Sequence, residues 1–169
     1  MDKSEIIVNK VANSNLITID LEKILGEIDI VEFDIKDFLY MELMLKEADF
    51  RENLTAIDWD QYRNKNIAVY CSTDAILAPW AFALVVANAK PFAKSIYQAT
   101  PQEAVTLIIR QKLSEHDWNQ YSGRRIILKG CSDKAIPSNA YSIATEHLID
   151  IADRIMYGEA CSFVPIWRK

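Results

Sequence analysis

Glycine is scarce in this sequence, with only four glycines among 169 residues. Neither the G-x-G-x-x-G pattern nor the Walker pattern of a phosphate-binding loop occurs. The sequence also lacks a basic tract with interleaved aromatic residues, which argues against nucleic-acid binding. Its longest apolar run, residues 75–87, contains Pro79 and is too short to cross a bilayer. We therefore expect no phosphate loop, no nucleic-acid partner and no membrane span.

A secretory signal is likewise not recognisable, because residues 1–10 alternate charged residues with small apolar pieces. We therefore expect a cytoplasmic protein. Cysteine occurs only three times, an odd number, and thiols persist in a reducing cytosol. These observations argue against a disulfide framework and favour metal binding, thiol reactivity or simple burial as roles for the cysteines.

The composition is that of a globular protein, since 50% of the residues are apolar and 25% are charged. A chain of 169 residues is long enough to bury one core of its own. The net charge of −5 is unevenly distributed: residues 1–60 carry a net charge of −9 and residues 61–169 a net charge of +4. We interpret the acidic first third as a solvated face or a partner surface.

Strand-like and helix-like segments alternate along most of the chain. Short β-branched runs predict strands at residues 29–33, 67–70, 94–97, 125–129 and 154–157. Helices are predicted over 35–50, from Pro79, over 101–115 behind a capping box, and from Ser138. Residues 15–26 favour a helix over a short strand, and an edge strand interrupted by Pro165 is expected near the end. The pattern predicts a single three-layer α/β domain over residues 1–169, with one mostly parallel sheet.

An internal repeat supports this architecture. Residues 58–72, DWDQYRNKNIAVYCS, align with residues 117–132, DWNQYSGRRIILKGCS, with seven identities in fifteen pairs. The similarity continues on both sides, so we predict a duplicated strand-helix-strand unit at about 55–99 and 114–158. In each copy an Asp-Trp-x-Gln-Tyr turn precedes a strand, and its Trp and Tyr are expected to hold the turn against the sheet.

The repeat places cysteines at the ends of strands. Cys71 and Cys131 each follow a predicted strand directly, and Cys161 follows the next one by four residues. In one parallel sheet all three would lie at the carboxyl edge, where open α/β folds bind ligands. Thiolates from neighbouring strands can converge on zinc or iron. We therefore predict a metal site of these three cysteines, with a fourth ligand from Asp74, Asp133, Glu159 or water.

Other interpretations of the cysteines stay open. Free cysteine is often simply buried, and no C-x-x-C pair is present. A reactive thiol is a third alternative, although the phosphatase pattern of Cys, five residues and Arg fails, since Leu77 and Pro137 occupy the arginine position. A Cys-His pair would need His116 or His147, and both are interpreted as structural or solvent-facing.

Four segments of the chain resemble a known family. They are IVEFDIKDFLYMELMLKEADFRE (30–52), VYCSTDAILAPWAFAL (69–84), LKGCS (128–132) and IMYGEACSFVPIWRK (155–169). Together they are similar to the Bacteroidetes domain-of-unknown-function family 2480 over nearly the whole length. The resemblance implies no defined activity, but it implies a genetic neighbourhood shared with the SUF iron-sulfur assembly system. That association is not a mechanism.

Three functional hypotheses follow. The first is an accessory or scaffold protein of iron-sulfur metabolism that binds metal through its cysteines. The second is a small-molecule-binding protein or enzyme with packed cysteines and a cleft at the carboxyl edge of the sheet; that cleft would be lined by Asp74, Trp80, Lys129, Asp133 and Lys134. The third is a homodimer or partner-binding module that uses the apolar helix around residues 38–44. The sequence does not decide whether the protein is an enzyme.

Overall fold

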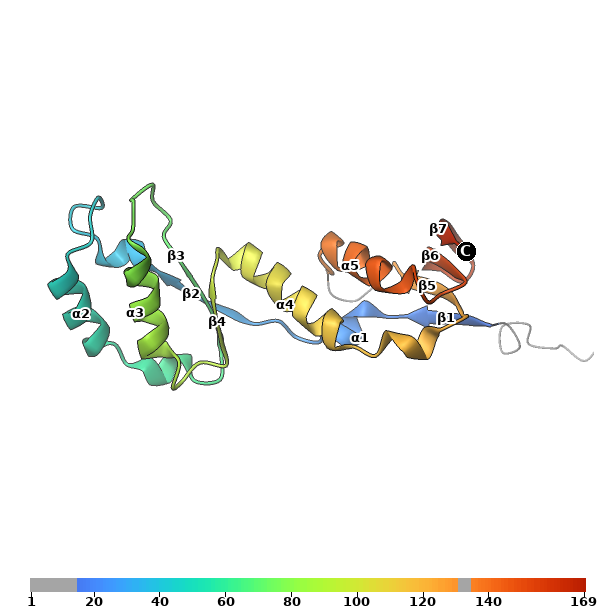
Figure 1. The fold of residues 1–169 in the computed structure, drawn as a ribbon, viewed down its shortest axis with the longest axis horizontal. Helices are drawn as coiled ribbons and strands as arrows, with labels where there is room; N and C mark the ends of the chain where they lie inside the picture. Colours follow the sequence, from blue (N-terminus) through green and yellow to red (C-terminus); the bar gives the residue numbers. More distant parts are fainter. Residues whose placement is uncertain (1–14, 131–134) are drawn as a thin grey trace, which may run out of the picture. The chain divides into compact units, whose positions relative to one another are not determined.

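The computed structural model describes residues 15–130 and 135–169 (Figure 1). Helices and strands alternate along these residues, and three short 3-10 helices (η) complete the elements. In chain order they are β1 (Leu16–Ile19), α1 (Leu21–Leu25), β2 (Ile30–Asp34), η1 (Ile35–Phe38), α2 (Glu47–Ala56), η2 (Trp59–Tyr62), β3 (Asn66–Tyr70), α3 (Pro79–Ala89), β4 (Ser95–Gln98), α4 (Pro101–Glu115), η3 (Trp118–Tyr121), β5 (Arg125–Lys129), α5 (Ser138–Leu148), β6 (Arg154–Glu159) and β7 (Ser162–Arg168).

The described strands form two sheets. One has the order β2-β3-β4 and is parallel throughout, and the other has the order β1-β5-β6-β7. In the second sheet only β7 runs antiparallel to its neighbour. The α/β class and the mostly parallel pairing predicted from the sequence are confirmed. The strands divide between two sheets, however, where we expected one.

The chain accordingly divides into two compact units. One unit comprises residues 27–108 and contains the β2-β3-β4 sheet. The other combines the segment up to Gly26 with the segment from Ile109 onward. The early strand β1 therefore pairs with β5, more than a hundred residues later in the chain. Such a long-range pairing leaves no local signal in the sequence.

One interior strand of each sheet, β3 or β5, is buried on both of its faces. In β3, Ile67, Ala68 and Val69 are fully buried, and in β5, Ile126–Leu128 are equally inaccessible. Continuous apolar runs of this kind are typical of parallel strands covered on both sides. Helix α3 packs against β3 and β4 and lies beside α2, as Figure 1 shows.

An aromatic cluster forms much of the core of the 27–108 unit. Phe33 of β2 stacks on Phe38 of η1 and on Trp59 of η2, with ring centroids 5.4 and 5.7 Å apart. Phe50 of α2 contacts Phe38 edge-on and is fully buried. These contacts join the four elements β2, η1, α2 and η2, which fixes the η1–α2 connection against the sheet.

The helix predicted over residues 35–50 is wrong as a single element. The chain forms η1, then an isolated bridge between Tyr40 and Met44, and only then α2. Met41 and Glu42 between them have positive φ angles of 51° and 58°, which a helix does not accommodate. Phe38 packs in the core, whereas Tyr40, Met41, Leu43 and Met44 are exposed. Because no helix follows η1 before α2, the predicted partner-binding helix at 38–44 does not exist in that form.

The N-terminal prediction is also corrected. Residues 15–26 contain both a strand, β1, and a short helix, α1, where a helix alone was favoured. Asp20 separates the two, because its carboxylate accepts a hydrogen bond from the amide of Glu22 and caps α1. Elsewhere the agreement is close: α4 covers residues 101–115 as its capping box predicted. None of the helices within the described residues is long and apolar enough to cross a membrane.

The two Asp-Trp-x-Gln-Tyr segments adopt the same local structure. Each forms a 3-10 helix whose Asp caps the first turn, at Asp58 in η2 and Asp117 in η3. In each, the indole Nε1 donates a hydrogen bond to a carbonyl five residues earlier. Trp59 donates to the Leu54 carbonyl at 2.9 Å, and Trp118 donates to the Leu113 carbonyl at 2.6 Å. Both tryptophans are buried, so the turn is held against its unit as predicted. Duplication of the larger unit stays a prediction.

Candidate functional site

The cysteines do not lie along one sheet edge in the way that the sequence led us to expect. Cys71 follows β3, whereas Cys161 lies in the turn between β6 and β7 of the other sheet. Cys131 and Asp133 lie outside the described residues. Within the described part of the chain, no group of three or more His, Cys, Asp or Glu side chains could hold a metal ion.

The two described thiols also differ in their surroundings. Cys161 is exposed, whereas Cys71 is half-buried and its Sγ lies 3.2 Å from Thr73 Oγ1. The candidate fourth ligand Asp74 is exposed and Glu159 is half-buried. A metal site that combines the three cysteines therefore stays a prediction without support from the described residues.

Cys71 instead forms part of a cleft within the 27–108 unit. The cleft has a volume of about 310 Å³ and lies where β3 and β4 end and α4 begins. Its walls combine a thiol, hydroxyl groups and apolar side chains, and contain one carboxylate. The lining residues are Val69, Tyr70, Cys71, Thr73, Ala75, Leu77, Phe82, Gln98, Ala99, Thr100 and Glu103. The carboxyl ends of parallel strands are the usual ligand position in open α/β sheets.

Asp34 fixes the segment that carries the thiol. Its Oδ1 accepts hydrogen bonds of 3.0 Å from the amide of Lys36 and from the amide of Ser72. The first bond caps η1, and the second joins the end of β2 to the residue next to Cys71. Burial acts to raise the pKa of Asp34, but the hydrogen bonds from Ser72 and Lys36 outweigh it and the pKa is lowered. Asp34 is therefore ionised at neutral pH and positions the Cys-Ser segment.

Tyr70 forms a second link between β2 and β3. Its hydroxyl donates to the carboxylate of Glu32, which lies on the neighbouring strand. This hydrogen bond, with burial and the charge of Glu32 as further causes, raises the pKa of Tyr70 to about 12. The phenol therefore stays protonated at neutral pH and acts as a hydrogen-bond donor, not as a base.

The first turn of α4 closes the cleft with a reciprocal cap. The Glu103 carboxylate accepts from the Thr100 amide at 2.9 Å and from the Thr100 hydroxyl at 2.8 Å. Thr100 Oγ1 lies 3.4 Å from the Glu103 amide, completing a capping box. The hydrogen bonds from the Thr100 amide and hydroxyl lower the pKa of Glu103. The cleft thus carries one fixed negative charge, and no lysine or arginine is among its described lining residues.

Comparison with known proteins places the chain in a family. Residues 5–169 match the family model described as "Protein of unknown function (DUF2480)". The chain belongs to this family. No curated protein and no solved structure matches the chain. The resemblance predicted from the sequence is confirmed over essentially the whole length.

The residues that we expected to line a cleft do not line the Cys71 cleft. Asp74 and Trp80 are outside the wall of the Cys71 cleft, and the Trp80 ring lies near Phe50 instead. Lys129 belongs to the other unit, where its Nζ lies 3.1 Å from Asp20 Oδ2. Asp133 and Lys134 lie outside the described residues. The position of the cleft at the carboxyl edge of a sheet was predicted, but the side chains that line it were not.

The two histidines pack around η3. His116 Nε2 lies 3.0 Å from the Tyr121 hydroxyl, and the His147 ring stacks on Trp118 with centroids 5.3 Å apart. Both belong to the unit that does not contain Cys71, so neither residue contributes to this cleft.

Sequence reasoning missed the aspartates that end the first strand of each sheet. Asp20 follows β1 and Asp34 ends β2, and each accepts a hydrogen bond from the amide two residues later. The sequence did contain a signal for these aspartates. Residues 17–21 (ITIDL) and 31–35 (VEFDI) share one order of residue types: apolar, polar, apolar, Asp, apolar. Burial acts to raise the pKa of Asp20, but its hydrogen bond and charge interaction with Lys129 lower it overall. The two strand ends are therefore alike locally, while duplication of the larger unit stays a prediction.

Proposed function

We propose that this protein binds a small neutral or positively charged molecule in the Cys71 cleft. The observation that carries the proposal is the make-up of that cleft: a half-buried thiol, hydroxyl groups and a carboxylate at the carboxyl ends of parallel strands. A volume of about 310 Å³ lies at the lower end of the range for ligand pockets and suits a compact ligand.

The charge of the cleft selects the class of ligand. Glu103 is fixed at the rim by its capping box, and no basic side chain among the described lining residues balances it. An anion would meet this carboxylate, whereas a neutral molecule or a cation would not be repelled. Thr73 and Gln98 supply hydrogen-bonding groups, and Leu77 and Phe82 supply an apolar wall.

The thiol is held where it can contact such a ligand. Asp34 holds the Ser72 amide and Thr73 Oγ1 lies beside Cys71 Sγ, so the segment 71–73 is fixed by two side chains. Preorganisation of this kind lowers the entropy that is lost on binding. The proposal assigns binding to the cleft and does not assign a reaction.

The iron-sulfur accessory role is the competing prediction. It needs Cys71 and Cys161 to act together with Cys131, and no described group of ligands supports it. The two hypotheses differ in a measurable way, because a shared metal site requires stoichiometric metal that depends on all three thiols. The cleft proposal requires none.

Charged thiol reagents test the cleft directly. We would compare 2-aminoethyl and 2-sulfonatoethyl methanethiosulfonate, which transfer a cationic or an anionic thioalkyl group to the thiol and release methanesulfinate. Peptide mass spectrometry would give the rate at Cys71, with N-acetylcysteinamide as the reference thiol. We expect Cys71 to favour the cationic reagent several-fold over the reference. Glu103→Gln should abolish most of that preference, because it removes the negative charge. Glutamine can still complete the capping box, so the local structure should be kept.

Two results would contradict the proposal. One is equal relative rates for the two reagents at Cys71, which would show that the carboxylate does not govern entry. The other is about one zinc or iron per chain after anaerobic purification, lost in Cys71→Ser and in Cys161→Ser alike; that outcome would favour the metal site. Thr73→Ser, which retains the hydroxyl, is the matched control for local packing.

A further inference from the structure

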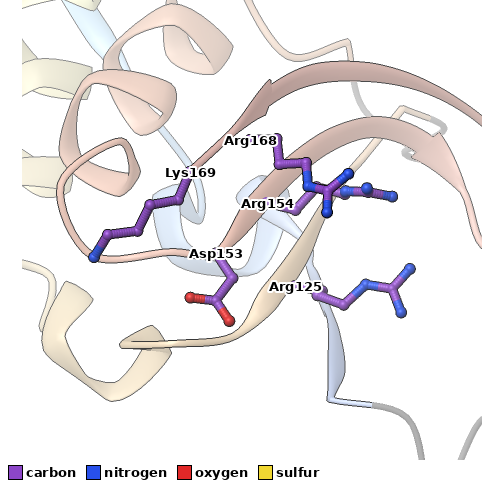
Figure 2. Close-up of a pocket in the computed structure, with 5 residues that line it drawn as sticks. All are labelled: Arg125, Asp153, Arg154, Arg168 and Lys169. Atoms are coloured by element: carbon purple, nitrogen blue, oxygen red, sulfur yellow. The ribbon is translucent and has the colours of Figure 1, made fainter.

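Three arginines occupy one row across the β1-β5-β6-β7 sheet. Arg125 of β5 is the register partner of Arg154 of β6, and Arg154 is the partner of Arg168 of β7. Register partners on neighbouring strands point to the same face of a sheet. Figure 2 shows the three side chains extending together to one side of the strands. We call Arg125, Arg154 and Arg168 the arginine row.

The row is electrostatically unfavourable by itself. Like charges placed directly opposite on paired strands destabilise a sheet. No ion pair within the described residues involves any of the three arginines at 4.0 Å or less. Asp153 is the nearby acid, but its carboxylate extends away from the guanidinium groups in Figure 2. Lys169 also lines the pocket, but its side chain extends away from the three guanidinium groups in Figure 2.

Protection of a sheet edge does not explain this arrangement. Basic residues on an edge strand discourage unwanted pairing, and Arg168 on β7 could serve that purpose. Arg125 and Arg154, however, lie on strands that are paired on both sides. Their positive charge therefore calls for another explanation.

The arginine row borders a pocket of about 580 Å³, lined by the three arginines, Asp153 and Lys169. We propose that this pocket binds the phosphate chain of a small molecule that carries two or three linked phosphoryl groups. Guanidinium groups suit this role, because their planar forks donate paired hydrogen bonds to phosphate oxygens.

The spacing of the row favours a chain of phosphates over a single phosphate. Neighbouring strands lie about 4.8 Å apart, so the row spans roughly 10 Å from Arg125 to Arg168. One phosphate can contact two neighbouring arginines, whereas a diphosphate or triphosphate can reach all three. Bound phosphate would also offset the repulsion within the row, which links ligand binding to stability.

This site is independent of the Cys71 cleft. It lies where β5 and β6 begin, in the other unit, and it selects the opposite ligand charge. The unit with the Cys71 cleft carries thirteen acidic and seven basic residues over 27–108, so the positive pocket is not a general property of the chain. Failure of one proposal leaves the other unaffected.

Calorimetric titration of the full chain with pyrophosphate, triphosphate and orthophosphate tests the proposal. We expect pyrophosphate and triphosphate to bind at least tenfold more tightly than orthophosphate. Arg154→Gln should weaken pyrophosphate binding about tenfold or more, because the middle arginine is lost. Arg110→Gln is the matched control, since Arg110 lies off the row on α4 with its NH1 3.7 Å from Glu146 Oε2, and binding should change less than twofold.

Thermal unfolding gives a second readout. Without ligand, Arg154→Gln should unfold at the wild-type temperature or above it, because a like charge is removed from the row. Pyrophosphate should raise the unfolding temperature of the wild type and of Arg110→Gln by similar amounts, and that of Arg154→Gln by clearly less. A purely structural role for Arg154 predicts the reverse: a lower unfolding temperature without ligand and an unchanged pyrophosphate effect.

Specific outcomes would overturn the inference. Equal weakening of pyrophosphate binding in Arg154→Gln and Arg110→Gln would show that the effect depends only on the net charge of the protein and not on the arginine row. Orthophosphate binding as tight as that of pyrophosphate would refute the phosphate-chain assignment. Tighter binding of a polyglutamate peptide or of a single-stranded oligonucleotide that lacks terminal phosphates would assign the row to a macromolecular partner instead.

Discussion

Replacing Asp34 by alanine should loosen the Cys71 segment and destabilise the 27–108 unit. Asp34 accepts two backbone hydrogen bonds, from Lys36 within η1 and from Ser72 beyond β3. Alanine removes both acceptors and leaves the two amides without this partner. The side chain is half-buried, so water can replace part of what is lost.

The magnitude follows from the two bonds. Loss of an N-cap side chain costs about 1 kcal/mol of unfolding free energy. A hydrogen bond to a charged acceptor contributes about 1.5–3 kcal/mol, and partial exposure favours the lower end for the Ser72 bond. Together we expect a loss of about 2–3 kcal/mol, which corresponds to a fall of roughly 5–10 °C in unfolding temperature for a chain of this size.

Amide hydrogen exchange and thermal unfolding would measure these effects. The Ser72 amide should exchange about tenfold faster or more in Asp34→Ala, and Cys71 should be alkylated faster by iodoacetamide. Asp20→Ala is the matched control: it removes the corresponding cap in the other unit and should leave Ser72 and Cys71 unchanged. Unaltered exchange at Ser72, or a stability loss below about 0.5 kcal/mol, would refute the reasoning.

The same carboxylate gives a pH dependence. The pKa of Asp34 in the folded protein lies below its ordinary value of 3.8. Its ionised form therefore stabilises the fold above that value, and this contribution is lost as the pH falls through the lowered folded pKa. Asp34→Asn should show a smaller loss of unfolding free energy than the wild type between pH 5 and the acid limit, measured by urea unfolding.

The remaining predictions concern alkaline stability, a buried indole and a tight turn. Because the folded pKa of Tyr70 is about 12, its hydrogen bond stabilises the protein below the ordinary pKa of 10.0 and is lost as the pH rises toward 12; Tyr70→Phe should unfold with less dependence on pH over that interval in urea titrations. Trp118→Phe should cost about 1–3 kcal/mol by chemical unfolding, because the buried carbonyl of Leu113 loses its donor; an unchanged midpoint would contradict the assigned bond. Gly158→Ala should destabilise the β6–β7 hairpin by more than 1 kcal/mol, since Gly158 has a φ of 129° and an added Cβ would lie 2.5 Å from the Ser162 carbonyl oxygen. Ala160→Gly in the same turn is its control, and equal melting temperatures for the two variants would disprove the steric argument.

Local features of the fold were predictable because their causes are local. The capping box of Thr100 and Glu103 is encoded in four consecutive residues, and α4 begins where that motif places it. The Asp-Trp-x-Gln-Tyr turns were recognised for the same reason, since the cap and the indole bond both lie within a few residues. The prediction of one helix over residues 35–50 was wrong because the apolar periodicity of this segment suits a helix. In the structure, packing of Phe38 against Phe50 favours two separate elements, η1 and α2.

The candidate sites show the same division. The position of Cys71 after a strand, and hence at a carboxyl edge, was readable from the sequence. Its partner Asp34 was not identified, because a hydrogen bond between residues 38 positions apart depends on how β2 and β3 align. The arginine row depends on register in the same way. Arg125, Arg154 and Arg168 are unremarkable in sequence, and only strand pairing places them opposite one another.

The sequence by itself therefore determined the α/β class, most strands and helices, and the repeated turns, because these arise from periodicity and capping over short stretches. Only the tertiary structure decided that the strands divide between two sheets and that Cys71 and Cys161 follow strands of different sheets. The physical reason is that sheet membership depends on which distant strands exchange backbone hydrogen bonds, and every strand offers the same backbone groups to any partner.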